Sequence, residues 1–466
     1  MQQISQPTRD FNLKPILTTV GVLTVVVALV NWGGTAKPGP LFVLGVGVLT
    51  VLLAALGGAI WYLFLSPLPK NTRVSQPQSS LVARSLAGVL AVSSGLMFSV
   101  ALVWDETWHH RYGGFGNDFL WSPHFLLYGS LAILAFFASA GMLFLALKGK
   151  GGIRERFRAE PLIGLLGLIA MFQTAAAPSD LLWHKIYGVD LTAWSLPHLM
   201  LFGGVSFVML CAVPLSLSSV PQGNWRGLSG LKLQEILAIG LISFAGILFV
   251  ILLAAEWEGI SSLPDFSSSN LRAFWQRPEW LYPVVLISLG GFVGSVAQHA
   301  LKRVGVSSLV GVVIVLHRLI TVAIFGGHNE GLSANSQLMV LPVFVLLDVW
   351  QASRLSRKLQ PTWSARGALI VAAASLAVML PIIPNLLIYP RINANTLPMM
   401  IVMSFLMMLA SSWAGSNLGA WLGSLGTRPS ALEQPSRSSS FVAAAGVVMA
   451  VALVFLAIVT AKPPTV

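Results

Sequence analysis

The sequence predicts an all-α, polytopic helical membrane protein, and three observations point to this fold class. Only 9% of the 466 residues are charged, whereas soluble domains carry roughly 25%. Apolar runs of about 20 residues, the length that crosses a hydrocarbon core ~30 Å thick, recur along the whole chain. These runs are continuous and lack the alternation of a membrane barrel strand, which indicates helices.

The apolar windows predict about thirteen transmembrane helices. The first window follows a polar segment, but it is longer than a signal-peptide core and lacks a clear small-x-small cleavage site. We therefore expect it to be retained as a span. The windows cover residues 15–32, 41–65, 81–107, 122–147, 161–183, 197–219, 233–255, 280–300, 304–325, 336–353, 367–389, 397–423 and 440–461.

The basic residues predict the orientation. With thirteen spans and a cytoplasmic N-terminus, twenty of the 28 Lys and Arg residues fall in cytoplasmic segments and seven on the opposite side. The positive-inside rule predicts this asymmetry, so the net charge of +12 indicates topology and not a nucleic-acid partner. We expect a multi-pass protein of the plasma (inner) membrane with an extracytoplasmic C-terminus. Its partner is the lipid bilayer, and further membrane subunits or a homo-oligomer stay open.

Two segments on the predicted outer side repeat one order of residues. Residues 104–130 read WDETWHHRYGGFGNDFLWSPHFLLYGS, and residues 179–204 read SDLLWHKIYGVDLTAWSLPHLMLFGG. Each contains Asp-x-x-Trp-His, then a short loop with an Asp, then a Pro-His pair that opens an apolar helix. Asp105 and Asp180 are 75 residues apart, which leaves two spans for each copy and predicts a duplicated two-helix hairpin.

This repeat divides the chain into three predicted parts. They are an N-terminal two-helix segment (1–80), the duplicated hairpin core (81–220) and a C-terminal helical bundle (221–466). A degenerate third copy within 233–300 would place Glu258 and Glu279 at the positions of the histidines, although a plain structural role is the favoured interpretation of both glutamates.

The repeated residues suit a metal site. Asp105 and His109 are four residues apart and share one helix face, while His124 opens the returning helix. An Asp/His/His set with open positions suits copper, and also zinc or iron. The second copy offers the same set in Asp180, His184 and His198. Candidates to support these ligands, or to add to them, are Asp118, Asp190 and His110.

A less specific interpretation competes with the metal site. An isolated Asp-x-x-x-His at a helix end is commonly a hydrogen-bonded pair, and the Trp residues suit an interfacial belt. The duplication and the returning histidine favour the metal. Elsewhere, we expect residues 149–160 to be a solvated linker, and Asp348 and His299 to lie at the interface. His317 lies mid-span and would pair with a carboxylate, line a cavity or pack against a helix.

The motif resembles one membrane component of the copper membrane monooxygenases, the C-type chain of the particulate methane, ammonia and hydrocarbon enzymes. The likeness covers residues ~80–220: Asp-x-x-x-His, fourteen or thirteen residues, then a histidine that opens a helix. That family has one Asp/His/His site and a neighbouring Asn/His/His site, so Asp180 departs from its pattern. The resemblance implies copper near the outer face of the membrane. It also implies, less directly, oxidation of a small apolar substrate by dioxygen.

Two other functions stay open on the sequence alone. A transporter or channel would use the Asp and His groups for proton or cation coupling, as many multi-pass transporters with internal repeats do. A haem or quinone redox subunit would use histidines as axial ligands, although these usually lie deep in a helical core. The only cysteine, Cys211, falls inside a predicted span, which excludes disulfides, Cys-rich zinc sites and iron–sulfur clusters.

Overall fold

The structure is a computed structural model that describes residues 14–15, 17–22, 25, 51, 54–68, 81–112, 122–148, 151–187, 196–218, 220, 223–254, 280–325, 338–383, 394–426 and 437–460. This part of the chain is helical and contains no β-strand; its one β-bridge joins Arg226 and Arg303. Its named helices are η1 (Trp61–Leu65), α3 (Leu81–Tyr112), α4 (Ser122–Lys148), α5 (Ile153–Ala159), α6 (Pro161–Tyr187), α7 (Leu196–Leu217), α8 (Leu233–Ala254), α10 (Leu281–Leu301), α11 (Val306–Phe325), α13 (Leu341–Ser356), α14 (Ala365–Met379), α16 (Leu397–Gly426) and α17 (Arg437–Thr460).

The membrane character predicted from composition is confirmed. Among the described residues, seven helices are long and apolar enough to cross a bilayer, namely α3, α4, α7, α8, α10, α11 and α16. Each predicted window from residue 81 onward coincides with a helix. However, α13 and α14 have only 16 and 15 residues, fewer than the ~20 that a span needs. The count of thirteen spans therefore stays a prediction.

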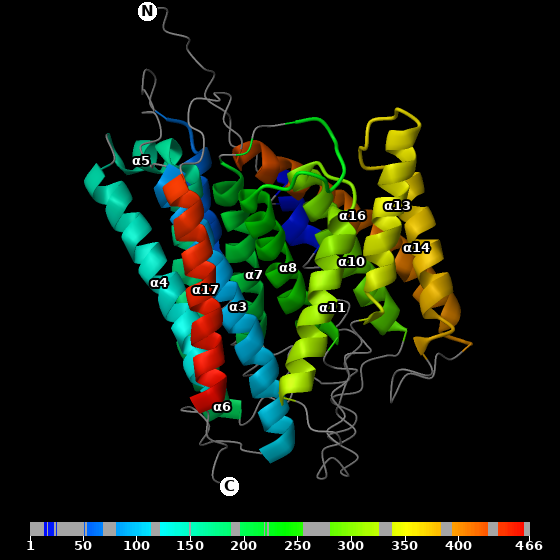
Figure 1. The fold of residues 1–466 in the computed structure, drawn as a ribbon, viewed down its shortest axis with the longest axis horizontal. Coiled ribbons are helices and arrows are strands. Elements are labelled where there is room, and N and C mark those ends of the chain that lie inside the picture. Colours follow the sequence, from blue (N-terminus) through cyan, green and yellow to red (C-terminus); the bar gives the residue numbers. More distant parts are fainter. Residues whose placement is uncertain are drawn as a thin grey trace, which may run out of the picture.

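The helices differ in how much of their surface they bury. In Figure 1, α10 lies within the bundle beside α16, while α4 lies on one flank and α13 and α14 on the other. The spanning window of α10 is entirely buried, whereas α4 and α11 bury only about a third of theirs. Phe136 and Leu147 of α4 are both 71% exposed. Large apolar side chains on an outer helix face suit contact with lipid.

Helices α10 and α16 approach each other backbone to backbone. Three glycines of α16, each four residues from the next, leave no room for a side chain, because a Cβ at each would collide with a carbonyl of α10. The facing pairs are Gly415 with Phe292, Gly419 with Val296 and Gly423 with Ala300. Small residues at this spacing are the usual device for close helix packing in membranes, where burial from water contributes little.

Within the segment 149–160, the described residues 151–160 do not form the solvated linker that the composition predicts. Its residues Ile153–Ala159 form the short helix α5, which lies across one end of the bundle (Figure 1). Phe157 is buried, and its ring meets that of Phe64 edge to face at 5.7 Å. Glu160 is also buried and accepts a hydrogen bond from Nη2 of Arg84 at 3.1 Å. Tertiary contacts with the helix ends therefore order the segment.

The two ends of the bundle carry different residues. In Figure 1, α5 and the segments 223–232 and 357–364 lie at one end, and the C-terminal ends of α3 and α6 lie at the other. We call the first the basic end, after Arg84, Arg154, Arg158, Arg226, Lys302, Arg303, Arg354 and Lys358. We call the second the motif end, because both repeated motifs lie there. Which end faces the cytoplasm stays a prediction from the positive-inside rule.

Candidate metal centre

The structure brings together two of the three residues of the first motif. Asp105 lies near the C-terminal end of α3, and His124 lies in the first turn of α4, directly after Pro123. Oδ1 of Asp105 and Nε2 of His124 are 3.1 Å apart. Their side chains are 18% and 17% exposed, so a small ligand can still reach the pair. Pro123 suits the first turn of α4, because a backbone N–H at that position would find no acceptor within the helix, so its absence costs nothing.

The separation of this pair suits two ligands of one metal ion. With bonds of about 2.1 Å, atoms 3.1 Å apart would subtend roughly 95° at a shared ion, between the square-planar and tetrahedral angles. A neutral imidazole and a carboxylate are also a normal donor set for copper, zinc or iron. The same distance also suits an ion pair between the carboxylate and a protonated His124. The residues present therefore fit a metal, and they also fit a plain ion pair.

Aromatic rings cluster on α3 and α11 near the first motif in the sequence, and one ring lies beside His124. Trp104 is almost fully buried, stacks on Phe325 of α11 with ring centroids 5.0 Å apart, and meets Trp108 edge to face at 5.2 Å. On the α4 side, the ring of His124 lies 5.6 Å from that of Tyr128. The residue that precedes Asp105 in α3 therefore belongs to a buried apolar cluster that joins α3 to α11.

The third residue of the first motif lies on the same helix as Asp105. Helix α3 includes both His109 and His110, but their side chains are outside the described part of the structure, as is Asp118 altogether. At 1.5 Å rise per residue, His109 is about 6 Å beyond Asp105 on the same face of the helix. The three-residue set around Asp105 therefore stays a prediction in which only the Asp105–His124 contact is described.

The second motif occupies the same helix positions as the first. Asp105 and Asp180 each lie seven residues before the end of their helices, α3 and α6. His124 and His198 are each the third residue of theirs, α4 and α7. This equivalence is what a duplicated hairpin requires. The duplication itself stays a prediction.

Of the second set, only the side chain of His198 is described. Its ring stacks on that of Phe202, with centroids 5.4 Å apart. His184 and Asp180 are placed as helical backbone without described side chains, and Asp190, Glu258 and Glu279 lie outside the described residues. Within the described part of the chain no three His, Cys, Asp or Glu residues gather closely enough to hold a metal. Three of the six proposed ligands, His109, Asp180 and His184, have no described side chain. The absence of such a group among the described residues therefore does not test the proposed metal sites.

A second group of ionisable residues lies inside the bundle. Nε2 of His317, in the middle of α11, is 3.0 Å from Oγ of Ser99 on α3. The neighbouring Arg318 is fully buried. The sequence suggested a carboxylate, a cavity or simple packing for His317, and the partner is a hydroxyl. Ser99 carries no signal of this role in the sequence, because serine is common within membrane helices.

A buried charge network surrounds Glu235 at the basic end, and nothing in the sequence pointed to it. Arg303 donates from Nε and Nη2 to the two oxygens of Glu235, at 2.7 and 2.8 Å. Its remaining N–H groups reach the carbonyls of Gly227, Ser229 and Gly230, so all five donors are used. Such complete pairing is what makes a buried guanidinium tolerable.

Asp348, which the sequence placed at the membrane interface, is buried between helices, and His299 is half-buried near the end of α10. Asp348 accepts hydrogen bonds from Nε2 of Gln298 at 2.7 Å and from the backbone N–H of Ser308 at 2.6 Å, in the first turn of α11. It therefore joins α10, α11 and α13. His299 has its Nδ1 3.0 Å from the Ser295 carbonyl, and its ring meets that of Trp225.

Comparisons with protein-family models, with characterised proteins and with solved structures found no match. The resemblance to the copper membrane monooxygenases therefore depends on the motif residues alone.

Proposed function

We propose that this chain is an integral membrane metalloprotein with a metal site, copper foremost, between α3 and α4 at the motif end. The observation that carries the proposal is the 3.1 Å contact between Asp105 and His124. These two residues come from different helices, and they are two of the three that the motif assigns to one ion. By the equivalence of helix positions, the proposal extends to a second site between α6 and α7.

Each residue of the first site has a definable role. Asp105 supplies negative charge, His124 supplies a neutral nitrogen from the facing helix, and His109 completes the set from the next turn of α3. Three protein ligands would leave coordination positions open, and copper held by these residues would supply dioxygen activation.

An apolar substrate would reach this site from the lipid. Phe125, next to His124 in α4, is an exposed aromatic side chain, and the rest of α4 also turns large apolar residues outward. A small hydrocarbon-like molecule partitions into the bilayer and meets this face without crossing water. The proposed activity is therefore a copper-dependent, monooxygenase-like oxidation of such a molecule.

Elemental analysis of purified protein tests the metal site. The wild type is compared with His124→Ala, His198→Ala and the double variant, and His328→Ala serves as a control outside both motifs. We expect one to two ions per chain in the wild type, a partial loss in each single variant, and an unchanged content in the control. If the wild type holds no stoichiometric copper, zinc or iron after reconstitution, the proposal is wrong.

A transporter or channel remains the second candidate, and a specific observation favours it. His317 and the fully buried Arg318 lie in the middle of α11, and ionisable groups at that depth usually serve ion or proton movement. Proteoliposome assays with a pH or cation gradient test this function. Uptake that depends on His317, in protein with unchanged metal content, would support transport over oxidation.

A further inference from the structure

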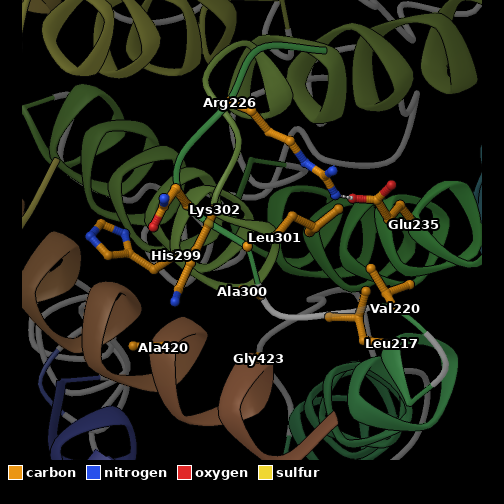
Figure 2. A pocket seen from close by; sticks show the side chains of 12 residues that line it. Leu217, Val220, Arg226, Glu235, His299, Ala300, Leu301, Lys302, Ala420 and Gly423 are labelled. Atoms are coloured by element: carbon orange, nitrogen blue, oxygen red, sulfur yellow. Dashed lines mark hydrogen bonds and ion pairs between the residues drawn. The ribbon is translucent and has the colours of Figure 1, made fainter. Parts of the chain in front are cut away.

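A small cavity opens at the basic end, between the C-terminus of α10, α16 and the chain that precedes α8. It measures about 40 Å³, room for roughly three waters. Its walls include Asn224, Arg226, Glu235, His299, Lys302 and Gly423. Figure 2 shows the Lys302 side chain reaching from the end of α10 toward α16, with the Arg226–Glu235 contact on the other side of the cavity.

The cavity has a surplus of positive charge. Both oxygens of Glu235 are held by Arg303, which is itself fully buried. Arg226 reaches the same carboxylate at 3.0 Å with a side chain that is 43% exposed, and because Arg303 already balances the single charge of Glu235, Arg226 adds a positive charge in excess. Lys302 adds another, and within the described residues its ammonium makes no hydrogen bond or ion pair. An anion would be stabilised here.

Lys302 adopts a backbone conformation that is unusual for a residue with a side chain. Lys302 caps α10 in the left-handed region, with φ 51° and ψ 47°. Glycine is the usual residue at such a position, because a Cβ there comes too close to the following carbonyl oxygen. A cation near a helix C-terminus gains some energy from the helix dipole, but that gain does not require this conformation. The lysine therefore occupies a position that backbone conformation alone would give to glycine.

We propose that this cavity binds a phosphate group, held between Lys302 and Arg226. Its volume suits a single tetrahedral anion and excludes a cofactor-sized ligand. Basic pockets between membrane helices, near the headgroup layer, commonly hold the phosphates of anionic lipids. The site lies at the opposite end of the helices from the metal motif, so it does not depend on the proposed metal function.

The test uses a pair of substitutions matched in backbone conformation. Lys302→Gly removes the ammonium and relieves the left-handed strain, so the variant is expected to fold. Lys358→Gly is the control, because Lys358 is the other described non-glycine residue with positive φ, at 57°, and it does not line the cavity. Both proteins are placed in nanodiscs of pure phosphatidylcholine or with added phosphatidic acid or phosphatidylglycerol. Native mass spectrometry counts the retained lipids, and titration with inorganic phosphate follows the thermal midpoint.

We expect Lys302→Gly to weaken binding about tenfold or more, the effect of losing one charged hydrogen bond, while Lys358→Gly binds as the wild type does. Retention of anionic lipid without a response to inorganic phosphate would identify a headgroup as the ligand. A response to inorganic phosphate in phosphatidylcholine discs would identify the free anion. If the wild type binds neither, or if both glycine variants bind equally well, the proposal is overturned.

Discussion

The close contact of α10 with α16 can be tested with one methyl group. A Cβ at Gly419 would lie 2.5 Å from the carbonyl oxygen of Val296 and 2.9 Å from its Cα. Carbon and carbonyl oxygen normally approach to about 3.3–3.6 Å across such interfaces. Because the colliding atoms belong to the backbone, no side-chain rotation relieves them. Gly419→Ala therefore requires the helices to separate locally by roughly 1 Å.

This separation sets the expected size of the effect. A gap of 0.5–1 Å forfeits roughly a quarter to a half of the dispersion energy between facing atoms, and overpacked cores lose about 1–3 kcal/mol. The better helix propensity of alanine offsets at most about 1 kcal/mol of this loss in the free energy of unfolding. We therefore expect Gly419→Ala to lower the free energy of unfolding by about 1–2 kcal/mol.

Unfolding in mixed micelles, followed by circular dichroism as the denaturing detergent is increased, measures this difference. Gly240→Ala in α8 is the matched control, because a Cβ there meets nothing within 4 Å. That variant should be neutral or slightly stabilised. If Gly419→Ala unfolds at the same detergent fraction as Gly240→Ala, or at a higher one, the backbone contact of α10 with α16 is wrong.

Two further predictions concern the buried polar groups. Glu235→Gln leaves the guanidinium of Arg303 without its counter-charge, so we expect a loss of about 3–5 kcal/mol in the same unfolding assay, whereas Arg226→Gln, on the exposed side, should cost less than about 1 kcal/mol. Equal losses in these two variants would contradict the buried pair. Asp348→Ala removes the acceptor of the Ser308 N–H, and each buried donor left unsatisfied costs roughly 1–3 kcal/mol. Asp348→Asn keeps an acceptor oxygen and should lose less; an equal loss would mean that the carboxylate does not cap α11.

The features that the sequence predicted are those that depend on local chemistry. Apolar windows identify helices because a helix satisfies its own backbone in lipid, and this property needs no knowledge of neighbours. The pairing of Asp105 with His124 was also predictable, because a short loop must return the chain beside the helix that it leaves. The contact between the two residues then follows from their positions at facing helix ends.

The features that the sequence did not predict depend on distant partners. Arg303 was counted as a loop charge under the positive-inside rule, although it lies against Glu235, 68 residues away. The segment 149–160 has the composition of a linker, yet the buried side chains of Phe157 and Glu160 hold its described residues, 151–160, against the bundle. One missed feature had a readable signal: GSNLGAWLG, residues 415–423, carries glycines at the spacing of a close helix contact.

The contacts of α3 explain how the Asp105–His124 pair is held. Oγ of Ser94, on α3, donates to the carbonyl of Ser130, on α4, at 3.0 Å, and both serines are fully buried. On its other faces, α3 is fixed by the buried Arg84–Glu160 pair at the basic end and by the contact of Ser99 with His317. Ligands must be held within about 0.5 Å for a metal site to be specific, and this requires that the supporting helices do not slide. These polar ties connect α3 to α4, to α11 and to the start of α6. They resist such sliding, and they place the two motif residues on opposing helices at a fixed separation.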